Sequence, residues 1–301
     1  MQNLALLVLC FTLGIALRRT GRLPEGAPAA LNAVIINVAL PALALAYIPD
    51  IPITPALGQA VMVAWLMFGL AAAFFYVAAR VWRLSRETTG ALILTAGLAN
   101  TSFVGLPMIE AFFGRHGMGL GLVIDQLGSY LILATFGILV ANVFSGTTFD
   151  PQRVMRKVLG FPPLWAIVVA LALRPFDYPD WLSALLHRLG DLVAPLALLS
   201  VGCQLRLGEI NGNAGKLGLG LAFKLVAAPV VMSLVLVGLL DAEGESMRIT
   251  LFEAAMPPMI GAAIVAMEHK LDPPLITLMV GIGIPLSFLT LPVWHAVLAR
   301  L

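Results

Sequence analysis

Two hydrophobic stretches of this chain, about 155 residues apart, are each interrupted by proline near the middle. They are residues 88–113, TTGALILTAGLANTSFVGLPMIEAFF, and residues 246–267, SMRITLFEAAMPPMIGAAIVAM. In lipid every backbone amide needs a hydrogen-bond partner, so a broken helix is tolerated only where it is buried in protein or lines a cavity. A matched pair of breaks in the two halves of a chain is typical of a transporter's substrate site. The pattern therefore predicts a membrane carrier.

The composition places most of the chain in a lipid bilayer. Hydrophobic residues make up 60% of the 301 residues, charged residues make up 11%, and the mean hydropathy is +0.98. Soluble domains carry about 25% charged residues, so a soluble fold could not bury this much apolar surface. The net charge of +2 is too small to indicate a nucleic-acid partner. At about 20 apolar residues per membrane helix, the chain divides into ten segments: 2–17, 28–48, 56–79, 88–113, 118–144, 159–174, 184–204, 215–240, 246–268 and 274–299.

The distribution of Lys and Arg predicts the orientation of these segments. If alternate loops share one side of the membrane, twelve of the 18 Lys and Arg residues fall on one side and five on the other. The remaining one, Lys224, lies inside a segment. Because cytoplasmic loops carry the excess of Lys and Arg, we expect a multi-pass protein of the plasma membrane, the inner membrane of a bacterium. Both termini should lie outside the cytoplasm.

Internal matches indicate two repeats of five helices. The sequences NVALPALALA and DLVAPLALLS place Pro195 154 residues after Pro41, and a shift of 157 residues lays Asn100 on Pro257 and Thr101 on Pro258, which puts the two breaks in register. Because each half holds an odd number of helices, the two halves must be inserted in opposite orientations. We assign the chain to a first inverted repeat, a cytoplasmic linker and a second inverted repeat, covering residues 1–145, 146–158 and 159–301.

The prolines of the two breaks predict a binding site for an anion. Proline removes a helical hydrogen bond, and glycine permits irregular backbone. The N–H groups at the start of the following half-helix carry partial positive charge, which suits a carboxylate. The alternative is a pair of ordinary proline kinks. The predicted substrate-binding residues are Asn100, Thr101, Ser102, Gly105, Pro107, Pro257 and Pro258.

Four polar residues inside the segments are candidates for charge compensation or ion coupling. Glu253 lies one turn before Pro257, where an ionised carboxylate costs a few kcal/mol unless it is paired, protonated or hydrated. Asp125 and Gln126 are similarly placed in the fifth segment, and Lys224 lies in the eighth. Lys224 has two candidate carboxylate partners, Glu253 and Asp125, and such a pair could also be purely structural. The candidate coupling ions are Na⁺ and H⁺.

Enzymatic chemistry has little support in the sequence. There is no H-E-x-x-H motif, no cluster of Cys and His, no P-loop and no glycine-rich dinucleotide turn. We therefore expect no metal and no cofactor, and uphill transport would draw on an ion gradient, the membrane potential or a partner. The Leu-Gly-Asp sequence at residues 189–191 is loosely similar to an intramembrane aspartyl protease signature.

Five motifs resemble those of the auxin efflux carrier family, which includes plant carriers and many bacterial permeases. They are ANTSFVGLPMIEAFFG from Ala99, NVALPALAL around Pro41, APLALLSVGCQL around Pro195, FKLVAAPV around Lys224 and EAAMPPM around Pro257. The resemblance covers essentially the whole chain, but only Ser145 to Lys157 replaces the long cytoplasmic loop of the plant members. It implies an all-α polytopic membrane protein of ten helices in two inverted repeats, with broken crossover helices 4 and 9. The architecture would be similar to that of bile acid sodium symporters.

These observations favour a secondary transporter or permease for a small organic anion. We expect the broken helices to move as one bundle against a scaffold of segments one, two, six and seven, which could also form a homodimer. The first alternative is a sodium- or proton-coupled symporter or antiporter of the bile acid type. The second alternative is an intramembrane hydrolase.

Overall fold

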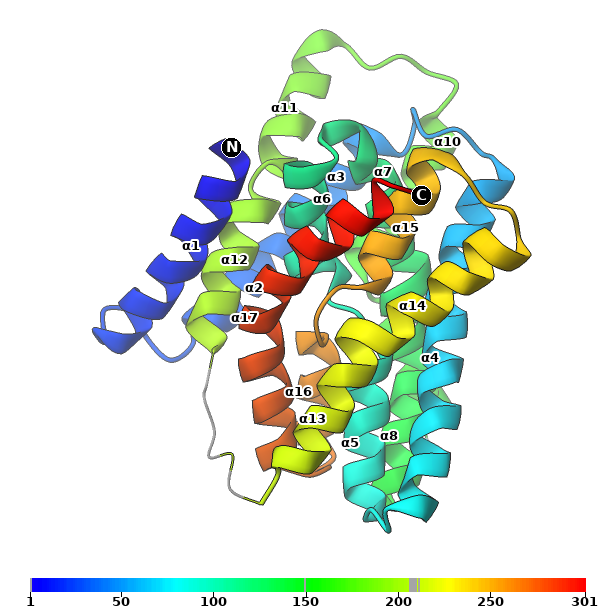
Figure 1. The fold of residues 1–301 in the computed structure, drawn as a ribbon. Helices are drawn as coiled ribbons and strands as arrows, with labels where there is room; N and C mark the ends of the chain where they lie inside the picture. The colour runs from blue at the N-terminus through cyan, green and yellow to red at the C-terminus, as the bar shows by residue number, and fades with distance from the viewer. Residues whose placement is uncertain (1, 149, 206–209, 211) are drawn as a thin grey trace. The chain divides into compact units, whose positions relative to one another are not determined.

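The computed structural model describes residues 2–148, 150–205, 210 and 212–301, which form helices joined by loops and turns (Figure 1). The chain folds into two compact units that alternate along the sequence. Unit 1 comprises Met1–Ile53, Ser102–Leu122 and Leu159–Leu205, and unit 2 comprises Thr54–Thr101, Val123–Val158 and Arg206–Leu301. Each unit therefore combines segments from both halves of the chain, whereas the assigned repeats follow one another. The repeat boundaries stay a prediction.

Unit 1 is built from three separate stretches of the chain, all mainly helical. Its helices are α1 (Gln2–Arg19), α2 (Ala27–Val34), the π-helical η1 (Ile35–Ala39), α3 (Leu40–Tyr47), α6 (Leu106–Phe112), the 3₁₀ turn η3 (Arg115–Gly117), α10 (Pro162–Leu173), α11 (Asp180–Gly190) and α12 (Val193–Gln204).

Unit 2 contains the longer helices. They are α4 (Pro55–Val81), α5 (Arg86–Gly97), the π-helical η4 (Ile124–Tyr130) and η5 (Leu133–Gly137), α8 (Ile138–Ser145), α13 (Ala214–Ala222), the π-helical η6 (Phe223–Ala227), α14 (Ala228–Ser233), the π-helical η7 (Leu234–Leu239), α15 (Gly244–Ala254), α16 (Ile260–Glu268) and α17 (Pro273–Leu298). Three elements begin in one unit and end in the other, namely the π-helical η2 (Thr101–Gly105), α7 (Met118–Val123) and α9 (Pro151–Leu159).

Six helical runs of the described chain are long and apolar enough to cross a membrane, which confirms a polytopic membrane protein. Two shorter apolar helices, Thr101–Phe112 and Pro162–Leu173, accompany them. The fourth and ninth predicted segments are absent from the six because each is interrupted at its break. The ten-helix layout therefore stays a prediction. The six runs are Ala27–Tyr47, Pro55–Val81, Arg115–Ser145, Asp180–Gln204, Ala214–Leu239 and Pro273–Leu298.

Proline explains where three of the π-helical segments lie. The segments η1, η2 and η6 each end two residues before a proline, at Pro41, Pro107 and Pro229. Proline has no N–H group, and its ring presses on the carbonyl four residues earlier. The preceding turn widens, so that Leu40 N–H bonds the carbonyl of Ile35, five residues back. A single π turn of this kind is often found at functional sites.

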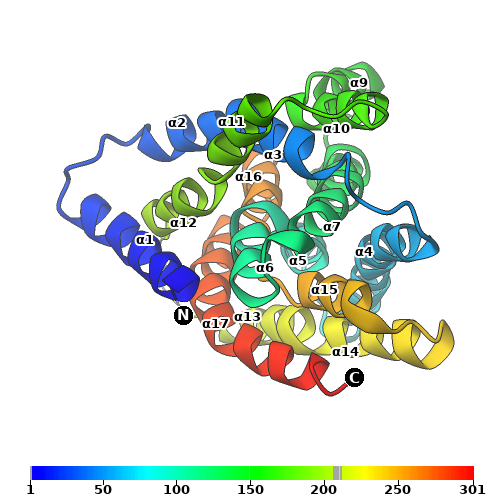
Figure 2. The ribbon, with the colours of Figure 1, turned by 90° about the horizontal axis from the view of Figure 1, so that it is seen from above.

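Glycine allows the backbones of α1 and α12 to contact each other in unit 1. Both views show these two helices side by side (Figure 1 and Figure 2). A Cβ atom added at Gly202 would lie 2.2 Å from the carbonyl oxygen of Phe11, and one at Gly14 would lie 2.3 Å from that of Leu199. The Cys203 thiol donates to the Gly14 carbonyl over 3.3 Å. Close packing through small residues is typical of contacts between transmembrane helices.

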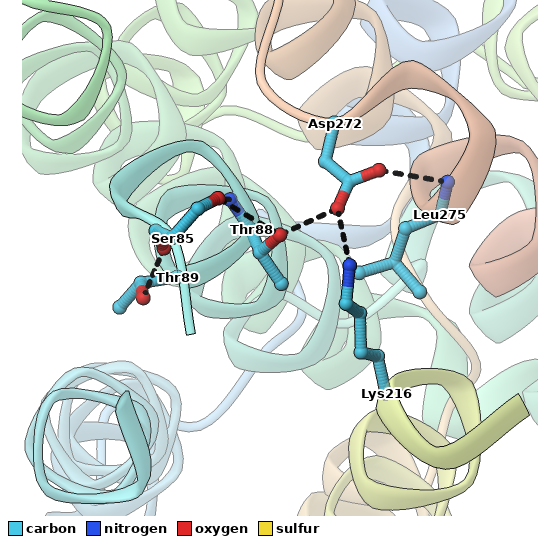
Figure 3. A network of polar contacts seen from close by, with 6 residues as sticks. All are labelled: Ser85, Thr88, Thr89, Lys216, Asp272 and Leu275. Atoms are coloured by element: carbon cyan, nitrogen blue, oxygen red, sulfur yellow. Dashed lines mark hydrogen bonds and ion pairs between the residues drawn. The ribbon is translucent and has the colours of Figure 1, made fainter. Parts of the chain in front are cut away.

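One end of unit 2 is held by a polar network around Asp272, which Figure 3 shows. Asp272 caps the start of α17, accepting from Leu275 N–H at 3.4 Å, and its other oxygen accepts from the Thr88 hydroxyl at 2.6 Å. Lys216 Nζ lies 3.5 Å from the same oxygen. Ser85 in turn caps α5 by accepting from Thr88 N–H at 3.1 Å. The starts of α5, α13 and α17 therefore meet at one end of unit 2. The charge pattern predicts all three on the same side of the membrane.

Candidate functional site

The two breaks lie side by side in unit 2 and complete each other's backbone hydrogen bonding. The chain leaves α5 after Gly97, and the segment between α15 and α16 runs antiparallel to it. Asn100 N–H donates to the carbonyl of Pro257 at 2.9 Å, and Met259 N–H donates to the carbonyl of Leu98 at 3.2 Å. Two irregular segments 159 residues apart thus form a short antiparallel pair within the apolar interior. We call this pair, residues 98–100 and 257–259, the crossing.

The first break begins at Leu98, just before the span Asn100 to Pro107 in which the sequence predicted it, and Pro107 is not its cause. Leu98 is extended, with φ −110° and ψ 131°, and helical turns resume at Thr101. Pro107 is instead the second residue of α6, after the widened turn η2. The pairing with Pro257 and Met259 stabilises the extended backbone here, and local sequence carries no signal of it. The second break falls at Met256 to Pro258, as predicted.

Next to the crossing, Asp125 accepts hydrogen bonds from two predicted site residues. The Thr101 hydroxyl donates to its Oδ1, and Gln126 Nε2 donates to its Oδ2 at 2.6 Å. Thr101 is 1% exposed, whereas Asp125 and Gln126 are fully buried. Two donors offset part of the desolvation cost of this carboxylate.

Glu253 is buried in the last turn of α15, with an exposed fraction of 1%. Within the described part of the chain, neither of its carboxylate oxygens has a hydrogen-bond partner. An unpaired ionised carboxylate in an apolar interior is strongly disfavoured. This side chain is therefore suited to bind a proton or a small cation.

A cavity of about 10 Å³ lies beside Glu253. Its polar lining consists of Glu253 and the hydroxyl-bearing Thr101, Ser129 and Thr250, and its apolar lining includes Met67 of α4. A cavity of this size holds about one water molecule. It is too small for an organic anion, so the structure has an ion- or water-sized site beside the crossing.

Lys224 pairs with neither of the carboxylates that the sequence suggested as partners. It is fully buried on η6, and its Nζ donates to the carbonyl of Ala254 at 3.0 Å. The Sδ atom of Met67 lies 3.7 Å from the same nitrogen. Ala254 is the last residue of α15, so the ammonium group lies at the C-terminal end of this half-helix.

The structure brings most of the predicted site residues together in unit 2. These are Asn100, Thr101, Asp125, Gln126, Lys224, Glu253, Pro257 and Pro258. The other three, Ser102, Gly105 and Pro107, are buried in unit 1.

Sequence reasoning missed four contributors to the site, namely Thr250, Ser129, Met67 and the Ala254 carbonyl. Thr250 lies three residues before Glu253 and therefore on the same helix face, which is a signal that could have identified it. Within the described ranges no group of three His, Cys, Asp or Glu side chains could hold a metal ion.

Comparisons with known proteins cover nearly the whole chain. A family described as "Membrane transport protein" matches residues 1–295. An uncharacterised transporter of Methanothermobacter thermautotrophicus is 28% identical over 98% of this chain and 97% of its own length. An uncharacterised transporter of Methanocaldococcus jannaschii is 24% identical over 72% of this chain and 71% of its own length.

Proposed function

Because this chain belongs to the membrane transport protein family of the auxin efflux carriers, as its motifs predicted, we propose that it is a secondary transporter or permease for a small carboxylate. The observation that carries this proposal is the crossing. Two broken helices meet at one buried point, where their backbone N–H and C=O groups pair with each other, beside a carboxyl group that has no hydrogen-bond partner in the described chain. Carriers use broken helices in this way to bind substrates and coupling ions near the middle of the membrane.

The proposed architecture is ten helices in two inverted repeats, with both termini outside the cytoplasm. It is supported by the similar offsets of Pro41 and Pro195 (154 residues) and of Asn100 and Pro257 (157 residues), and by the Lys and Arg distribution. The network around Asp272 adds support, because it joins the starts of α5, α13 and α17, all expected on the cytoplasmic side, at one end of unit 2. The proposed cellular location is the plasma membrane.

The proposed mechanism is an elevator-like movement. Unit 1 contains the predicted scaffold segments one, two, six and seven, together with Ser102–Leu122, and unit 2 contains the crossing. The chain passes between the units inside the first broken helix, between Thr101 and Ser102. A movement of unit 2 against unit 1 would carry the crossing with it. Scaffold helices of this kind could also pair in a homodimer.

The substrate carboxylate is proposed to bind Asn100 and the N-terminal end of the helical run Thr101–Phe112. The N–H groups at such an end are not used within the helix and carry partial positive charge. Asn100 is 1% exposed and lies directly before that end. Its amide adds a hydrogen-bond donor for the anion.

A coupled symporter or antiporter of the bile acid type is the second candidate. The unpartnered Glu253 beside a cavity of about 10 Å³ specifically favours it, since this arrangement fits H⁺ or Na⁺. The hydrolase alternative lacks comparable support. Asp191 of the Leu-Gly-Asp sequence is 41% exposed in its side chain and is held by Arg115 at 2.8 Å.

Flux into proteoliposomes tests the proposal. The purified protein should accumulate or exchange a radiolabelled mono- or dicarboxylate, and imposed Na⁺ and pH gradients separate uniport from coupled transport. Uptake that follows the Na⁺ gradient would favour the symporter. Absence of flux for a broad carboxylate panel, together with peptide cleavage, would refute the carrier and favour the hydrolase.

A further inference from the structure

Lys224 lies at a position where broken-helix carriers bind cations. Its ammonium group is fully buried and lies 3.0 Å from the carbonyl oxygen of Ala254, the last residue of α15. The last four carbonyls of a helix have no partner within the helix, and this end carries partial negative charge. The C-terminal ends of interrupted helices coordinate Na⁺ or H⁺ in other carriers. Here an amino group of the protein itself occupies that end.

The local structure explains how Lys224 reaches the end of α15. Pro229 follows η6 and widens the turn that holds Lys224. One extra residue in a turn rotates the preceding side chains by about 100° relative to the following ones. The Sδ atom of Met67 in α4 lies 3.7 Å from Lys224 Nζ, so the thioether covers the amino group where it faces α4. Glu253 is adjacent in sequence to the carbonyl that Lys224 binds.

We propose that Lys224 acts as a covalently attached cation that replaces a bound Na⁺ or K⁺ at the end of α15. The inference rests on the proposed carrier function and deepens it. A side chain of the protein supplies the positive charge that holds the C-terminal end of α15 beside the crossing. The carrier therefore needs no sodium to assemble its transport site, and Lys224 is a positioning residue. With the cation position at the end of α15 occupied by Lys224, the coupling ion of this carrier would be a proton, bound at Glu253.

Two variants of Lys224 should respond differently to an added cation. Lys224→Ala leaves a space bounded by the Ala254 carbonyl and Met67, with Glu253 next to it in the sequence. A small cation could enter that space and restore the missing charge. Lys224→Met fills the same space with an uncharged chain of similar length, so an added cation should not restore it. A merely structural lysine would give no such difference between the two variants.

Thermal unfolding of the purified protein tests the inference without any transport measurement. Trp294 is a suitable reporter, because its indole N–H donates to the carbonyl of Leu225, the neighbour of Lys224, at 2.9 Å. Melting is followed by tryptophan fluorescence in NaCl, KCl and choline chloride at equal ionic strength. Lys216→Ala is the matched control, because it removes the other lysine of the same helical run.

The wild type and Lys216→Ala should each melt at the same temperature in all three salts. In choline chloride, Lys224→Ala should melt at least about 5 °C below the wild type. Replacing choline with Na⁺ or K⁺ should restore part of that melting temperature until the cation site is saturated. Lys224→Met should stay low in every salt. Saturable stabilisation of the wild type by Na⁺ would overturn the inference, even if neither Lys224 variant can be purified. An equal response of Lys224→Ala and Lys224→Met would also overturn it.

This readout separates the inference from the proposed function. If the wild type moves no carboxylate, the carrier proposal fails whatever the melting curves give. If it moves a carboxylate only when Na⁺ is present, the carrier proposal holds and the attached-cation inference fails.

Discussion

Gly283 is the residue at which packing against the crossing can be tested most directly. It lies in α17, and a Cβ atom added there would be 2.8 Å from Cδ of Pro258 and 2.9 Å from a methyl group of Leu221. Pro258 is a rigid ring in the crossing, flanked by the two residues that form its backbone hydrogen bonds. Gly283→Ala should therefore push Pro258 away from α17 and strain those hydrogen bonds.

The magnitude follows from two opposing effects. Overpacking of a core costs about 1–3 kcal/mol, while alanine in place of glycine within a helix gains about 1 kcal/mol. The net loss should be about 0–2 kcal/mol, and each kcal/mol lowers the melting temperature by about 2–4 °C in a protein of comparable size. Gly218→Ala in α13 is the control, since nothing lies within 4 Å of the added atom. That variant should keep or slightly raise the melting temperature.

The assay is thermal unfolding of both variants together with carboxylate flux in proteoliposomes. Gly283→Ala should melt below Gly218→Ala by several degrees and should transport more slowly. The reasoning is refuted if the two variants have the same melting temperature and the same flux, because α17 would then tolerate displacement of Pro258.

Three further predictions address topology, charge and packing. A reporter fused after Leu301 should read as non-cytoplasmic and one inserted within residues 153–157 as cytoplasmic, and reversed readings would exclude the proposed orientation. Glu253→Gln should insert and melt like the wild type but lose the dependence of flux on its coupling ion, whereas unchanged ion dependence would leave Glu253 a structural role. Gly202→Ala should lower the melting temperature by several degrees, because its Cβ would lie 2.2 Å from the carbonyl oxygen of Phe11; calorimetry showing no change would contradict the packing of α1 on α12.

The sequence predicted those parts of the fold that depend on local chemistry. The second break follows from Pro257 and Pro258, which cannot continue a helix. Proline also causes the widened turns before Pro41, Pro107 and Pro229, which were not predicted. The family was also correctly identified from motifs spread over the whole chain.

Features that depend on contacts between distant segments could not be predicted. Leu98 to Asn100 form an extended segment because Pro257 and Met259 pair with them, and nothing in the local sequence requires it. Sequence reasoning sought a carboxylate partner for Lys224 because opposite charges attract. The actual acceptor is a backbone carbonyl at a helix end, which every residue type has and which the sequence therefore cannot identify. The cavity beside Glu253 likewise depends on the packing of α4 and η4 against α15.

Asn100 gives the most direct test of the claim that the crossing is the transport site. Loss of a hydrogen bond to a charged substrate in a buried site costs about 1–3 kcal/mol, so Asn100→Ala should weaken carboxylate binding by about 5- to 150-fold. Asn142→Ala is the matched control, because Asn142 is also buried in unit 2 but bonds the Ile138 carbonyl of its own helix. Concentration-dependent carboxylate uptake into proteoliposomes should show the loss for Asn100→Ala and near wild-type affinity for Asn142→Ala. Wild-type uptake affinity in Asn100→Ala would contradict the account and place the substrate elsewhere.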